Sequence, residues 1–301
     1  MKHWWLLILL LATLTGIAQS TSVPTIIRDI TYYRGPDYDA PNHKLNLLLP
    51  EAVTTPPLLV WIGGGAWSQV SREVEMDLAI KLAEQGIAVA TVSHRLSAAT
   101  WQDSTLLPAA RHPQHAIDVA RAIRFLYEHA AKYKFSPDKV FIGGFSSGAH
   151  LAALVAMDSA YLSQQDLPKD LIKGVIPVSG TFDIPHYRQI LTEGLSADFA
   201  NRHIGSVFGL TEEEMADASP TSYLEGFDIP MLLISDRDMM RYHTFFEKKL
   251  SAAGVTKVHS INLLNYGHGD LWRHLSHAQT SRYRNIIVDF IKQDDTTIIS
   301  Q

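Results

Sequence analysis

Cysteine is absent from the 301-residue sequence. Its absence excludes disulfides and a lipid-modified N-terminal cysteine, so packing alone must hold the fold, and a chain of this length has enough interior for that. An excess of basic residues is also missing, because the formal net charge is -5 at pH 7 and no basic stripe occurs. Nucleic acid is therefore not an expected partner. Low-complexity tracts and internal repeats are lacking too, which together with 46% hydrophobic residues favours one globular domain.

A membrane-spanning run is missing as well. The apolar stretch at residues 4–12 is shorter than the roughly 20 residues that a spanning helix needs. A lysine before it and small residues after it give the layout of a secretory signal peptide at residues 1–20, with cleavage after Ala18 or Ser20. We therefore expect a secreted or periplasmic protein that is not inserted in a membrane after cleavage, with an uncleaved anchor as the alternative.

The rest of the sequence alternates apolar runs typical of strands with segments of helical spacing. Alternation of this kind indicates parallel crossovers and a sheet that is covered on both faces. Residues 184–219 contain no clear strand and predict a small cap inserted above the sheet. Expected strands lie at residues 25–33, 44–49, 57–62, 86–92, 139–143, 174–178, 230–235 and 258–264, and expected helices at 71–85, 115–134, near 151, at 244–253 and at 277–292.

One strand-to-helix junction carries a candidate nucleophile. Residues 144–148 read GFSSG, between the expected strand at 139–143 and an apolar helical run. This matches the Gly-x-Ser-x-Gly turn that raises a serine hydroxyl at the carboxyl edge of a parallel sheet. Only Ser146 is in frame, because a motif centred on Ser147 would need glycine at 145 and 149. The alternative is an ordinary turn whose hydroxyl only caps the helix.

A serine nucleophile needs a base and an orienting acid, and candidates for both follow at later strand ends. The strand at 230–235 is followed by Asp236 and Asp238, and the strand at 258–264 by His268 between two glycines. This is the chain order that hydrolases built on such a sheet use. We predict His268 as the base and Asp238 as the acid, because the acid commonly lies several residues beyond its strand. Asp236 is the alternative acid.

Backbone N–H groups must also bind the oxygen that becomes negative during acyl transfer. One donor is expected from Ser147, the residue after the nucleophile. The loop after the strand at 57–62 reads GGGAW, from Gly63 to Trp67. Its glycines let the backbone approach a bound substrate without side-chain obstruction. This loop is therefore the expected source of the other donors.

These motifs, together with KLNLLLP, SHRLS, SDRD and YGHGD, resemble those of α/β-hydrolases of the esterase and lipase type. The resemblance is to bacterial carboxylesterase-like and feruloyl-esterase-like enzymes, and extends to kynurenine formamidases. It implies an α/β-hydrolase domain at residues 21–301, with a mostly parallel eight-stranded sheet, helices on both faces and a small cap insertion. By the family's pattern the loop donors are Gly65 and Ala66, and Trp67 lies in the wall of the acyl pocket. Gly63 stands where relatives commonly carry histidine, and Ala66 where they carry glycine.

The sequence thus predicts a cofactor-free serine hydrolase that cleaves a small-molecule carboxylic ester through an acyl-enzyme intermediate. Trp67 and Tyr266 are the expected substrate-binding aromatics and favour a small or aromatic acyl group. An arylformamidase-like amide hydrolase would use the same residues, whereas a catalytically silent binding protein would lack one of them. The run at 268–277 holds three histidines, but no acidic partner completes a metal set, so no metal is expected.

Overall fold

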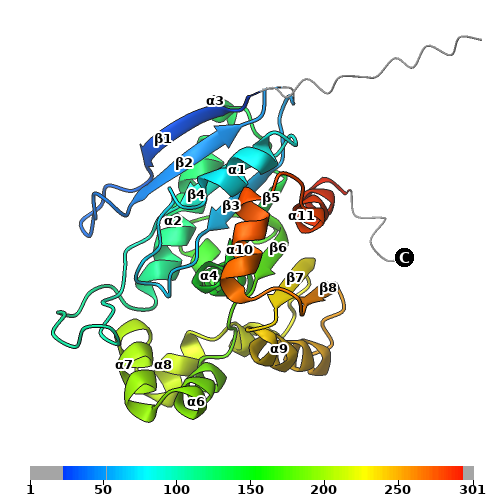
Figure 1. Ribbon diagram of the computed structural model, residues 1–301. Helices are drawn as coiled ribbons and strands as arrows, with labels where there is room; N and C mark the ends of the chain where they lie inside the picture. Colours follow the sequence, from blue (N-terminus) through cyan, green and yellow to red (C-terminus); the bar gives the residue numbers. More distant parts are fainter. Residues whose placement is uncertain (1–22, 52, 294–301) are drawn as a thin grey trace, which may run out of the picture.

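The computed structural model describes residues 23–51 and 53–293, so the predicted signal peptide lies outside the described residues. Eight strands form one sheet in the order β1-β2-β4-β3-β5-β6-β7-β8 (Figure 1). β2 pairs antiparallel with β1 and β4, and all the other pairs are parallel. The predicted sheet is therefore confirmed. The strands are β1 (Thr25–Thr31), β2 (Lys44–Leu49), β3 (Leu58–Ile62), β4 (Ala88–Val92), β5 (Val140–Phe145), β6 (Ile172–Val178), β7 (Met231–Asp236) and β8 (Val258–Leu263).

Helices cover both faces of the sheet. Every residue of β3 is apolar because both of its faces are buried. Leu58, Val60 and Ile62 pack in the core on one face of the sheet, and Leu59 and Trp61 pack in the core on the other face. Within the described residues, no helix is both long and apolar enough to span a membrane. The first face is covered by α2 (Gln114–Glu128), α4 (Ser147–Met157), α5 (Ser159–Ser163) and α9 (Met240–Ala252), the second by α1 (Met76–Ala83), α10 (His268–His277) and α11 (Arg282–Lys292), while α3 (Ala130–Tyr133) follows α2.

Three helices occupy the connection between β6 and β7, where the sequence predicts a cap. They are α6 (Ile184–Gly194), α7 (Ala197–Val207) and α8 (Glu212–Asp217), and they lie together at one end of the molecule (Figure 1). Asp183, Ser196 and Thr211 each accept a backbone hydrogen bond at the start of one of these helices, which explains where each helix begins. A 3-10 turn, η1 (Pro220–Tyr223), leads towards β7. We call these helices the α6–α8 segment.

The sequence analysis missed α10, because residues 268–277 are mostly polar. Leu271 and Leu275 lie one turn apart on the helix and are buried against the sheet, which is enough to fix it. Arg284 of α11 donates to the carbonyl oxygens of Leu275 and Ala278, at 2.8 and 3.1 Å, and so satisfies the end of α10. The helix expected at 277–292 is confirmed as α11, although it begins at Arg282 and not at 277, and residues 268–277 form the separate helix α10, of which His268 is the first residue.

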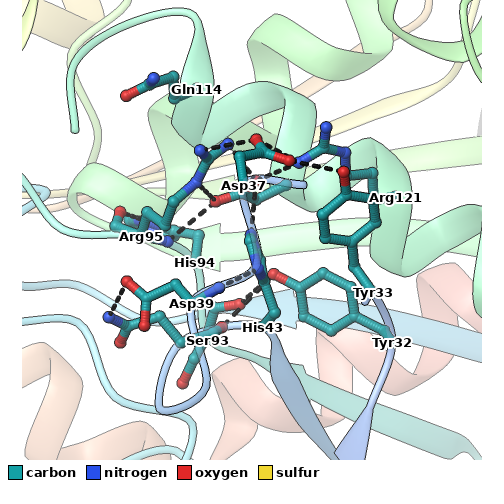
Figure 2. Close-up of polar contacts among 12 residues, drawn as sticks. Tyr32, Tyr33, Asp37, Asp39, His43, Ser93, His94, Arg95, Gln114 and Arg121 are labelled. Carbon is teal, nitrogen blue, oxygen red and sulfur yellow. Dashed lines mark hydrogen bonds and ion pairs between the residues drawn. The ribbon is translucent and has the colours of Figure 1, made fainter. Parts of the chain in front are cut away.

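An ionic network with Asp118 buried at its centre joins the β1–β2 connection to α2 (Figure 2). The Asp118 carboxylate accepts hydrogen bonds from the Nε and Nη2 atoms of Arg95, at 2.9 and 2.8 Å, and His43 Nε2 lies 3.0 Å from Asp118 Oδ1. Arg95 and Arg121 both bind Asp37, which comes from the β1–β2 connection. Burial opposes ionisation of Asp118, but His43 and Arg95 outweigh it and lower its pKa to about 2.

Candidate active site

Ser146 lies on a sharp turn between β5 and α4. Its backbone has φ 56° and ψ -118°, a conformation that L-residues rarely adopt. The flanking glycines are required by space: a Cβ on Gly144 would lie 2.5 Å from the carbonyl of Gly148, and a Cβ on Gly148 would lie 2.0 Å from the Ile62 oxygen. The Ser146 N–H donates to the Val178 oxygen at 2.9 Å. Neighbouring strands thus hold the turn in place, as the motif predicts.

His268 lies opposite this serine. Its Nε2 is 2.9 Å from Ser146 Oγ, and its Nδ1 is 2.8 Å from Asp236 Oδ2. Phe145 stacks on the imidazole with ring centroids 4.7 Å apart. The parallel register explains the meeting, because β5, β7 and β8 all end at the same edge of the sheet. The structure therefore brings Ser146 and His268 together as the sequence predicts.

The acid beside the imidazole is Asp236, and the prediction of Asp238 for this place is corrected. Asp236 is the last residue of β7, and its Oδ1 accepts the N–H groups of Asp238 and Met239 at 2.8 and 3.0 Å. The turn closed by these bonds directs Asp238 away from the imidazole. The Asp238 carboxylate instead accepts the backbone N–H of His268 at 2.9 Å. The two acids therefore have different roles: Asp236 orients the imidazole of His268, and Asp238 accepts the backbone N–H at the start of α10.

The environment of Asp236 keeps it ionised. Its side chain is completely buried, and burial favours the neutral form. Hydrogen bonds from His268 and Ser179 outweigh burial, so the pKa of Asp236 lies below its ordinary value. A carboxylate therefore faces Nδ1 of the imidazole, which fixes the proton on Nδ1 and leaves Nε2 free to accept the Ser146 proton.

The glycine loop after β3 has an unusual backbone. Gly65, Ala66 and Trp67 all have positive φ, at 141, 50 and 59°. The Gly65 oxygen accepts the N–H groups of Ser68 and Gln69, which closes the loop into a tight turn. A Cβ on Gly64 would lie 3.1 Å from the Ser146 Cβ, so the loop passes directly beside the serine.

The backbone N–H groups of Gly65, Ala66 and Ser147, the positions predicted to donate to an oxyanion, have no acceptor among residues 23–51 and 53–293. The Ser147 Oγ is also buried without a partner, and the imidazole contacts Ser146 instead. Unpaired N–H donors are rare in folded proteins and are suited to a bound anion or a negatively charged intermediate.

The two predicted aromatic residues have different surroundings. Trp67 is 2% exposed, and its ring packs on Phe208 and His150, with Nε1 3.2 Å from His150 Nδ1. Trp67 therefore joins the glycine loop to the end of α7. The Tyr266 ring packs against His274 of α10 and Tyr283 of α11. Its role as a substrate-binding residue stays a prediction.

Sequence reasoning missed Glu75, a buried acid behind the glycine loop. It precedes α1, is 2% exposed, and accepts a hydrogen bond from Trp61 Nε1 at 2.9 Å. The sequence carried one weak signal: Gly63 has no side chain, so in a close-packed interior another side chain must occupy the space beside it. The identity of the side chain that fills it is visible only in three dimensions.

Comparisons with known proteins agree with this geometry. Esterase LipC of Mycobacterium tuberculosis is 27% identical over 250 residues, a match that covers 79% of this chain and 58% of LipC. Kynurenine formamidase of Danio rerio is 27% identical over 212 residues, which are 70% of this chain and 60% of the formamidase. The chain therefore matches less than two thirds of the length of either relative.

Among solved structures, esterase B of Lactobacillus rhamnosis superposes with a TM-score of 0.74 at 19% identity, covering 89% of this chain and 86% of that one. This likeness shows the fold. The family model BD-FAE matches residues 45–240, which is more than half of the chain. The chain therefore belongs to the BD-FAE family and has the α/β-hydrolase fold.

Proposed function

We propose that the chain is a serine esterase that cleaves carboxylic esters through an acyl-enzyme intermediate. The observation that carries the proposal is the continuous hydrogen-bonded path from Ser146 Oγ through His268 to the buried Asp236 carboxylate. A nucleophile, a base and an orienting acid at hydrogen-bond distance are what acyl transfer requires. The name of LipC, an esterase, is consistent with this chemistry.

The proposed reaction has two halves. Ser146 Oγ attacks the ester carbonyl carbon while His268 Nε2 takes the hydroxyl proton, and Asp236 stabilises the imidazolium. The N–H groups of Gly65, Ala66 and Ser147 bind the oxygen of the tetrahedral intermediate. His268 then gives its proton to the departing alcohol, and water attacks the acyl-enzyme by the reverse use of the same groups.

The bond that is cleaved also has a second candidate, an aryl formamide. The observation that favours it is the similarity to kynurenine formamidase, which spans 70% of this chain. Both bonds would use the same serine, histidine and acid. Comparison of kcat/KM for N-formylkynurenine and for nitrophenyl acetate separates them, and faster turnover of the formamide would replace the ester proposal.

A nitrophenyl ester series of increasing acyl length tests the acyl group. Trp67 and the α6–α8 segment pack against each other beside the glycine loop, which favours short or aromatic acyl groups over long chains. We therefore expect kcat/KM to fall beyond a short acyl chain. A maximum at long chains would contradict this assignment.

Labelling with a fluorophosphonate probe tests the nucleophile itself. We expect the wild type and Ser147→Ala to be labelled, and Ser146→Ala to remain unlabelled. Ser147→Ala is a matched control because it removes a neighbouring buried hydroxyl and keeps the backbone N–H. Labelling of Ser146→Ala, or no labelling of the wild type, would overturn the proposed function.

A further inference from the structure

The carboxyl group of Glu75 fills the space beside Gly63, the first residue of the glycine loop. A Cβ on Gly63 would lie 2.8 Å from Glu75 Oε1 and 3.0 Å from Glu75 Cγ. Gly63 is not among the glycines with positive φ, so its backbone conformation does not require glycine. Glycine is required at position 63 for a steric reason, because any Cβ there would collide with the Glu75 carboxyl group.

Two tryptophan N–H groups hold this carboxyl group. Trp61 Nε1 donates to Oε2 at 2.9 Å, and Trp272 Nε1 donates to Oε1 at 3.4 Å. No cation forms an ion pair with Glu75 within the part of the chain that the structure describes. Burial raises the pKa of Glu75, and the two indole hydrogen bonds oppose that effect only in part. Such a group is costly to bury, so its place needs an explanation.

Its partners lie on the two elements that build the candidate site. Trp61 belongs to β3, which leads into the glycine loop, and Trp272 lies on α10 one turn after His268. α10 begins at His268, so a displacement of this helix would move the imidazole. α1, which follows Glu75, packs against α10. Glu75 therefore contacts the loop and the histidine helix at once.

We propose that Glu75 is a positioning residue for the ester hydrolysis proposed above, on which this inference rests. Its carboxyl group fixes Gly63 and Trp272 together, and so sets the distance between the loop N–H groups and the imidazole across Ser146. It does not touch the reacting atoms. A carboxyl group suits the place because both oxygens accept an indole N–H, whereas glutamine has one acceptor oxygen and an amide that would face a donor.

Two single variants test the proposal by separating kcat from KM. We expect Glu75→Gln to lower kcat for nitrophenyl acetate by about tenfold, less than the full loss of one oxyanion donor, with KM changed by less than about twofold. A trifluoromethyl ketone forms a tetrahedral adduct with the serine, and its affinity should fall by about the same factor as kcat. We expect Gly63→Ala to act in the same direction, because its Cβ displaces the carboxyl group.

A double variant tests whether the two positions act through one contact. In a Glu75→Ala background the carboxyl group is gone, so adding Gly63→Ala should lower kcat little further. If Glu75→Ala does not fold, Glu75→Gln and Gly63→Ala decide by the same comparison of kcat with KM. Asp77→Asn is the control, because Asp77 also joins α1 to α10, through His277 at 3.0 Å, but lies away from the loop.

An activity-independent readout completes the test. Glu75→Gln should shift the indole N–H signals of Trp61 and Trp272 in a proton–nitrogen NMR spectrum, and Asp77→Asn should not. With an active wild type, the positioning role would be refuted if kcat were unchanged in Glu75→Gln, or if kcat fell and KM rose by the same factor. It would also be refuted if Gly63→Ala lowered kcat equally in the wild-type and the Glu75→Ala backgrounds. A wild type that neither labels with fluorophosphonate nor cleaves esters would refute the proposed function and this inference with it.

Discussion

Replacement of the two neighbouring acids, Asp236 and Asp238, should have very different effects on catalysis. In Asp236→Asn the amide would replace the Oδ2 that accepts from His268 Nδ1 at 2.8 Å. An amide N–H facing Nδ1 favours the tautomer whose proton is on Nε2, so the imidazole could no longer accept the Ser146 proton. The expected loss is ~10⁴-fold in kcat, or about 5 kcal/mol of transition-state stabilisation.

Asp238→Asn keeps an acceptor oxygen for the backbone N–H of His268 and removes only a charge from a side chain that is 50% exposed. Its kcat should stay within about fivefold of the wild type, because an exposed charge near a helix start contributes less than about 1 kcal/mol. Both variants are assayed with nitrophenyl acetate and by the rate of fluorophosphonate labelling, with the melting temperature as a check on folding. A loss of kcat in Asp238→Asn that equals or exceeds the loss in Asp236→Asn would refute the geometric assignment.

Three further predictions concern stability and the elbow. Gly148→Ala places a Cβ 2.0 Å from the Ile62 oxygen and should lower the free energy of unfolding by more than about 3 kcal/mol and abolish labelling, as measured by urea denaturation and the probe. The pKa of Asp118 is lower in the folded protein than in the unfolded chain, so its carboxylate stabilises the fold at any pH above the unfolded pKa of about 4. About 2 kcal/mol of unfolding free energy should therefore be lost as pH falls from about 4 to about 2, and Asp118→Asn should flatten this pH dependence in thermal melts. Trp67→Phe removes the N–H that His150 Nδ1 accepts and should lower the unfolding free energy by roughly 1–3 kcal/mol in urea, whereas an unchanged midpoint would contradict the buried bond.

The sequence could place Ser146 and His268 because strand ends and glycine turns are local features. It could not choose between Asp236 and Asp238, since the choice depends on where β7 ends. The apolar run predicts an end at 235, and the strand continues by one residue, so Asp236 lies at the edge with its side chain held by the turn that follows. One residue of strand length thus decides which acid reaches the imidazole.

Two other residues show a different limit. Tyr266 is near His268 in sequence, but its ring packs against Tyr283 in α11, a contact that no local pattern reveals. Glu75 is separated from Trp272 by 197 residues, so its role depends on tertiary packing of α1 against α10. Local periodicity predicts which face of a helix is buried. It does not predict which distant side chain will meet that face.

The order of strands in the sheet determines when during folding the serine can become reactive. Ser146 follows β5, and its histidine, 122 residues later, follows β8 at the far edge, with β6 and β7 in between. Contacts of such sequence separation form late, because the intervening chain must be ordered first. Partly synthesised or partly refolded chains would therefore hold helices and a partial sheet without an activated hydroxyl, and hydrolytic activity would return after the helical circular dichroism signal. The long connection between nucleophile and base thus delays the chemistry until the sheet is complete.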